Sequence, residues 1–178
     1  MSVKDILDFW FEELTPQQWY KKDPELDQRI GERFESTLIA GSKGELSDWR
    51  ETLTGRLAEI ILLDQFSRNI YRDQAQAFAS DPVALVLAQE AITGCDVLAL
   101  PVVRRTFLYM PFMHSESLMV HDVAVRLFTE LGSEDNLNYE HKHRDIIKQF
   151  SRYPHRNAIL ERTSTEQELE FLRSNPGF

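Results

Sequence analysis

The sequence LAEIILLDQFSRNIYR, from Leu57 to Arg72, decides the fold. Drawn as a helix at about 100° per residue, it carries apolar side chains over most of its circumference: Leu57, Ile60, Ile61, Leu62, Leu63, Phe66 and Tyr71. A helix that is apolar nearly all round is usually buried by its neighbours. We therefore expect this segment to be a central helix against which other helices pack.

Charged residues interrupt this apolar surface. Asp64 lies in the middle of it, Arg68 follows one turn later, and Arg72 continues the row. A buried carboxylate requires partners, because leaving it unpaired is costly, and Asp before Arg at i,i+4 is the favourable order. The row is either a structural ion-pair network or a means by which Asp64 orients Arg68, or a histidine from elsewhere, toward a ligand.

Signals for helix ends recur along the rest of the chain. Capping residues or prolines mark expected starts at Ser2, Asp23-Pro24, Thr54, Asp81-Pro82, Ser115 and Thr165 with Glu168, and Gly94 marks an end. The alternating runs typical of half-buried strands are missing. These patterns predict an all-α fold of about eight or nine helices, arranged as antiparallel pairs. The starts near Pro82 and Ser115 are roughly 34 residues apart, the length of a tetratricopeptide helix pair, which favours a tetratricopeptide-like arrangement.

The composition of the 178 residues indicates one soluble domain spanning residues 1–178. A formal net charge of −9 argues against a nucleic-acid or anionic-membrane partner, because phosphate contacts need positive charge. Cys95 is the single cysteine, which excludes an intrachain disulfide and a cysteine-rich zinc site. No signal peptide or membrane span is expected, which favours the cytoplasm.

A short basic segment lies within this acidic chain. Residues 141–162 carry six lysines and arginines against two acids. Pro154 interrupts the expected helix, so four polar side chains should be presented from a loop: Arg152, His155, Arg156 and Asn157. Arginine suits carboxylate or phosphate groups, and His155 between two arginines should stay neutral and able to act as a base. Alternatively, these arginines cap helices and pair with the surplus acids.

Other histidines lie at less specific positions. His143 and His121 each interrupt an apolar helix face, where a histidine is more often a hydrogen-bonded core residue than a catalyst. His114 should precede a helix start, with Glu116 in the first turn, where an anion is favoured. Helix capping explains Glu116 equally well. The histidines form no compact ligand motif, so we assign no metal site. The sequence does not identify a cofactor.

Several segments together resemble a known family. They are Leu7–Phe11, Leu63–Arg72, Phe107–Glu116, His143–Ile147, Pro154–Asn157 and Ser164-Thr165. Over nearly its whole length the chain is similar to the bacterial domain of unknown function 924. The resemblance implies an all-helical, tetratricopeptide-like fold and no assigned activity. The family pattern leads us to expect Pro in place of Ser67, and Gly in place of Ser151 and Glu161, the last two flanking the loop that carries His155.

We expect a small-molecule site, enzymatic or not, at which ten residues converge: Asp64, Arg68, Arg72, His114, Glu116, His143, Arg152, His155, Arg156 and Asn157. Arginines of this set would hold a small anionic ligand. His143 or His155 would be the acid or base, and Asp64 or Glu116 would orient it. The alternative is a helical scaffold that binds a peptide or protein partner in a groove.

Overall fold

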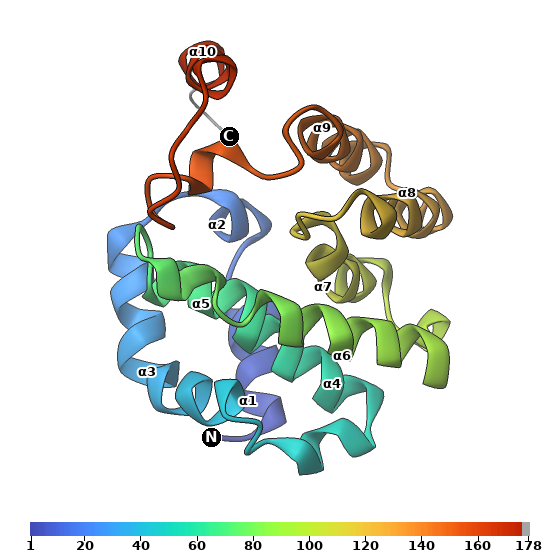
Figure 1. Ribbon diagram of the computed structural model, residues 1–178. Helices are drawn as coiled ribbons and strands as arrows, with labels where there is room; N and C mark the ends of the chain where they lie inside the picture. Colours follow the sequence, from blue (N-terminus) through green and yellow to red (C-terminus); the bar gives the residue numbers. More distant parts are fainter. Residues whose placement is uncertain (176–178) are drawn as a thin grey trace.

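The computed structural model describes residues 1–175, and within them it contains helices and turns but no strand (Figure 1). The α-helices are α1 (Val3–Asp8), α2 (Pro16–Tyr20), α3 (Pro24–Ser42), α4 (Leu53–Ile60), α5 (Ser67–Ile70), α6 (Asp81–Gly94), α7 (Val102–Met113), α8 (Leu118–Leu131), α9 (Glu134–Phe150) and α10 (Glu166–Ser174). The π-helical turn Phe9–Glu13 extends α1, and the π-helical turn Ile61–Phe66 joins α4 to α5. When each continuous run is counted once, this part of the chain holds nine helices, which confirms the predicted class and number.

The segment that begins at Leu57 forms the centre of the fold. Every residue from Leu57 to Phe66 is at most 8% exposed. Helices α1, α3, α6 and α7 pack against this run (Figure 1). At its end, the ring of Phe66 contacts those of Phe9, Trp10 and Phe34. The predicted central helix is confirmed, and its π-helical turn carries Asp64.

Several predicted helix starts are confirmed by their capping contacts. Ser2 and Asp5 form a capping box at the start of α1, and Thr165 and Glu168 form another at the start of α10. The Asp23 carboxylate accepts hydrogen bonds from two backbone N–H groups in the first turn of α3. These side chains satisfy N–H groups that have no partner within the helix.

Other predicted starts are wrong by a few residues. Thr52, rather than Thr54, caps α4, and Ser117, rather than Ser115, precedes α8. Asp81 is the first residue of α6 and does not cap it; its carboxylate instead accepts hydrogen bonds from two arginines. Because α6 and α8 start further apart than a tetratricopeptide pair, the tetratricopeptide-like arrangement stays a prediction.

Helices α7, α8 and α9 are neighbours in space and are joined by short turns, as expected of antiparallel pairs (Figure 1). α7 continues through Pro111 to Met113, although a proline inside a helix usually kinks or ends it. After α9, Pro154–Arg156 forms a 3₁₀ turn, in agreement with the predicted loop. None of the helices within residues 1–175 has the length and apolar character that a membrane span requires.

The three departures from the family pattern have visible consequences. Ser151 and Glu161 both adopt a left-handed backbone conformation, with φ of 60° and 55°. Glycine adopts this conformation without strain, whereas a side chain makes it costly. The Ser67 hydroxyl donates to the Leu63 carbonyl at 2.6 Å, a contact that proline could not make. Two strained residues therefore flank the turn that carries His155 and Arg156.

Candidate functional site

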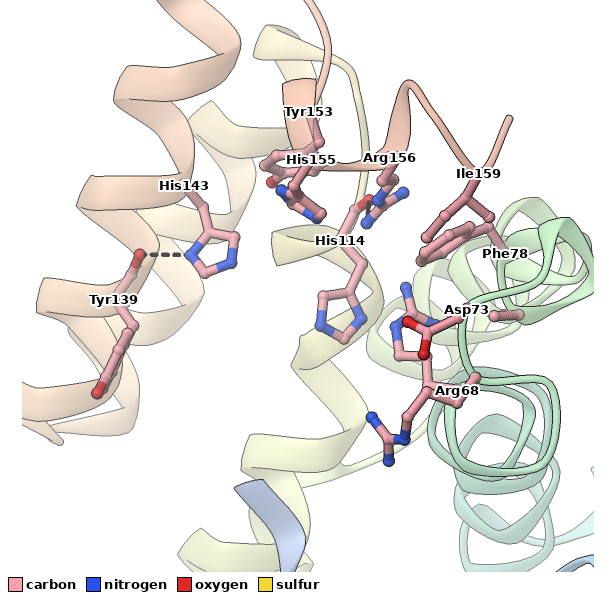
Figure 2. Close-up of a pocket in the computed structure, with 12 residues that line it drawn as sticks. Arg68, Asp73, Phe78, His114, Tyr139, His143, Tyr153, His155, Arg156 and Ile159 are labelled. Carbon is pink, nitrogen blue, oxygen red and sulfur yellow. Dashed lines mark hydrogen bonds between the residues drawn. The ribbon is translucent and has the colours of Figure 1, made fainter. Parts of the chain in front are cut away.

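A pocket of about 470 Å³ lies among α5, the 3₁₀ turn Ala75–Phe78, the end of α7, α9 and the segment that follows α9 (Figure 2). Its walls are formed by Arg68, Arg72, Asp73, Ala77, Phe78, His114, Tyr139, His143, Tyr153, His155, Arg156 and Ile159. Six of the ten predicted site residues are in this set. The fold thus brings together side chains that lie far apart in the sequence.

Asp64 and His114 form a buried pair at the wall of this pocket. The Nδ1 atom of His114 lies 2.7 Å from Oδ1 of Asp64, a residue that is 1% exposed. Burial by itself favours the protonated acid, but Arg68 and His114 hold the pKa of Asp64 well below its usual range. An ionised carboxylate can only accept hydrogen bonds. His114 therefore donates through Nδ1, and its Nε2 atom carries the lone pair.

The ring of His114 is uncharged near neutral pH. Burial lowers its pKa, Arg68 lowers it further, and Asp64 offsets this only in part. A neutral imidazole held in one tautomer by a carboxylate is the arrangement that enzymes use for a general base. The sequence predicted for Asp64 either a structural ion pair or the orientation of Arg68 or of a distant histidine. The contact with His114 agrees with the orientation of a histidine.

Two arginines share one carboxylate beside this pair. Arg68 donates to both oxygens of Asp81 at 2.8 and 2.9 Å, and Arg156 donates to Oδ2 at 3.2 Å. Arg68 also lies 3.1 Å from Oδ1 of Asp64. The predicted i,i+4 ion pair is therefore present, and it continues through Asp81 to the segment after α9.

The charge of Arg156 is compensated in part: it shares the Asp81 carboxylate with Arg68, and it donates to the His114 carbonyl at 3.1 Å. Its guanidinium lies between two aromatic rings, 4.5 Å from the centroid of Phe78 and 4.6 Å from that of Tyr153. Its side chain is 7% exposed, and within residues 1–175 no acceptor contacts its buried Nε. Burial, and next the charge of Arg68, lower its pKa. An added negative group at this point would relieve the repulsion between the two guanidinium groups.

Two more neutral imidazoles face the same space (Figure 2). His143 donates through Nδ1 to the Tyr139 carbonyl at 2.8 Å, so its other ring nitrogen is turned toward the pocket. Burial lowers the pKa of His143 to about 3. Burial and the neighbouring Arg156 lower the pKa of His155 to about 4.

A buried histidine outside the pocket fixes two of its walls. His121 is fully buried, and its Nε2 lies 2.9 Å from the Ser115 carbonyl and 3.1 Å from the Tyr153 hydroxyl. Its Nδ1 lies 2.7 Å from Glu140, which is fully buried as well. This agrees with the interpretation of His121 as a hydrogen-bonded core residue. It holds the turn after His114 against the aromatic ring that stacks on Arg156.

The remaining predicted site residues have structural partners. Arg72 lines the pocket but forms two hydrogen bonds to Asp27, at 2.6 and 2.8 Å. Three others lie outside the pocket: Glu116 accepts from Arg162 and from the Tyr153 backbone N–H, Arg152 pairs with Glu168, and Asn157 donates to Ser164. For Arg152, the predicted alternative of pairing with surplus acids agrees with these contacts.

Three residues that contact the Arg156 guanidinium were not identified from the sequence: Asp81, Phe78 and Tyr153. Asp81 was interpreted as a helix cap because it precedes a proline. Phe78 and Tyr153 carried no polar signal, since a single aromatic residue is more often part of the core. Among the 29 acidic residues, no local pattern marks Asp81 as the carboxylate that Arg68 and Arg156 share.

The described residues contain no group of three or more histidine, cysteine, aspartate or glutamate side chains placed to hold a metal ion.

The comparisons with known proteins agree with the fold. A family model described as bacterial protein of unknown function (DUF924) matches residues 6–176. The solved structure of a protein of unknown function, ATU0120 from Agrobacterium tumefaciens, is similar with a TM-score of 0.92 and 37% sequence identity. The similarity covers 97% of each chain. No curated protein matches the chain.

Proposed function

The chain belongs to the DUF924 family of bacterial proteins of unknown function, and we propose that it binds a small anionic molecule in the pocket around Arg156. The observation that carries the proposal is the position of Arg156: a buried guanidinium in the pocket wall, stacked between two rings, that shares its carboxylate with Arg68. A carboxylate or phosphate group beside Arg156 would complete its hydrogen bonding.

The same pocket is equipped to accept a proton. His114 is neutral, is held by Asp64, and presents Nε2 as an acceptor close to the two arginines. The bound anion would place an acidic O–H, N–H or C–H group against this nitrogen, and the arginines would stabilise the negative charge left behind. The proton acceptor is therefore His114, rather than the His143 or His155 that the sequence favours. The latter two contribute neutral imidazole rings to the wall of the same pocket.

The dimensions of the pocket favour a small molecule. A volume of about 470 Å³ is in the range of small-molecule sites, and polar groups converge on it from five segments. A peptide-binding groove would be longer and lined by apolar anchors. The helical scaffold with a protein partner stays the alternative prediction.

The proposal is tested by calorimetric titration of the protein with inorganic phosphate at low ionic strength. We expect saturable binding by the wild type and at least a tenfold lower affinity for Arg156→Gln, because charge-assisted hydrogen bonds are lost. The matched control is Arg144→Gln, since Arg144 also forms an ion pair, with Asp122, but lies away from the pocket. Equal affinity of the wild type and a folded Arg156→Gln variant would contradict the proposal.

A further inference from the structure

A second pocket adjoins the first. It has a volume of about 420 Å³, and Phe78, His114 and Arg156 belong to the walls of both. It lies between the start of α6, the end of α7 and the segment that follows the Pro154–Arg156 turn. The residues common to both pockets are the ones that the proposed function uses, so a group bound at Arg156 sits where the two pockets meet.

The two pockets differ in chemistry. The first is lined by three histidines and three arginines. The second is lined mainly by apolar side chains: Ala75, Phe78, Ala79, Pro82, Leu85, Pro111 and Leu160. Its two carboxylates are already engaged, Asp81 by Arg68 and Arg156, and Glu116 by Arg162. Its surface therefore suits a hydrocarbon group, which gains free energy from burial, better than a polar group, which would need hydrogen bonds.

From this pairing we infer that the anion bound at Arg156 carries an apolar substituent, and that this substituent occupies the second pocket. The ligand class is an organic carboxylate or phosphate with a hydrocarbon or aromatic body, in contrast to an inorganic ion or a sugar phosphate. The inference rests on the proposed function, because it takes Arg156 as the anchor of the negative group. Burial of hydrocarbon between Phe78, Leu85 and Leu160 adds affinity that the anion alone does not have.

The test is a calorimetric series with straight-chain carboxylates from acetate to octanoate. Each methylene that enters the second pocket should raise the affinity by about two- to fourfold, until the pocket is filled. Ala79 is exposed at the rim of this pocket, so Ala79→Phe should fold and fill it. In that variant, phosphate and acetate should bind with the affinity of the wild type, and the increase in affinity with the chain length of the carboxylate should disappear. The matched control is Val86→Phe on α6, at an exposed residue outside both pockets, where the gain should persist.

The outcomes separate this inference from the proposed function. If phosphate binds through Arg156 but all carboxylates bind equally, the second pocket is not part of the site and the inference is overturned alone. It is also overturned if Ala79→Phe, shown by circular dichroism to be folded, keeps the gain with chain length. If neither phosphate nor any carboxylate binds, the proposed function fails as well.

Discussion

Acidification from pH 7 to pH 5 should destabilise the fold through the imidazoles of the pocket. The folded state lowers the pKa of His143 to about 3 and that of His155 to about 4, whereas an unfolded histidine has a pKa of about 6.5. Between these values the unfolded state binds more protons than the folded state, so stability falls as the pH falls below about 6.5.

The magnitude follows from the shifts. A pH of 5 is about 1.5 units below the pKa of an unfolded imidazole. This difference corresponds to a loss of about 2 kcal/mol in the free energy of unfolding for each group. Because His143 and His155 are partly accessible at the pocket, we expect a combined loss of about 2–4 kcal/mol. Carboxylates with lowered pKa values, such as Glu168 at about 2, lose their contribution only below about pH 4.5, so among the groups with lowered pKa values the histidines dominate this window.

The assay is urea unfolding at pH 7, 6 and 5. His143→Gln and His155→Gln should each reduce the pH dependence, since each removes one of the imidazoles whose pKa is lowered; His114 accounts for part of what remains. His141→Gln, at an exposed residue of α9, is the control and should leave the dependence as it is. A free energy of unfolding that is the same at pH 7 and pH 5 would refute the reasoning, because it would mean that both imidazoles are protonated as readily in the folded state.

Three further predictions concern the backbone, the core and the Asp64–His114 pair. Ser151→Gly and Glu161→Gly should each raise the free energy of unfolding by about 0.5–1 kcal/mol in urea titrations, because both residues have positive φ; Ser151→Ala should give no gain. Phe66→Ala should lower it by about 3–5 kcal/mol, since the ring is fully buried, and a loss below about 1 kcal/mol would contradict the packing of the central helix. At pH 7, long-range ¹H–¹⁵N spectra should show His114 protonated on Nδ1 only. Asp64→Asn should lower the free energy of unfolding by about 3 kcal/mol, because Asp81 is then the one carboxylate left to pair with Arg68 and it is shared with Arg156. A proton on Nε2 of His114 in the wild type would contradict the proposed orientation.

The helices could be predicted from the sequence because their signals are local. The apolar surface of residues 57–66 and the caps at Ser2, Asp23 and Thr165 depend on neighbours within one or two turns. One error came where a side chain had two possible partners. Asp81 can cap α6, but two guanidinium groups from other segments offer stronger charge-assisted bonds, and the carboxylate turns to them.

The site could be predicted only in part, for a related reason. Arginine and histidine in the segments 64–72 and 152–157 indicated a polar cluster, and four of those side chains line the pocket, together with the predicted His114 and His143. Which charges are already satisfied depends on tertiary partners: Arg72 finds Asp27, Arg152 finds Glu168, and Arg156 keeps an unpaired Nε. Such pairing over 16 to 75 residues leaves no pattern in a single sequence.

The most direct test of the anion site is a crystal structure of the protein with selenate, whose selenium atom is located by anomalous scattering. We predict a selenium peak in the pocket, with an oxyanion oxygen about 3 Å from the guanidinium of Arg156 and no peak at that position in Arg156→Gln crystals. A wild-type structure with selenate bound only elsewhere, at a concentration that saturates the protein in solution, would contradict the account.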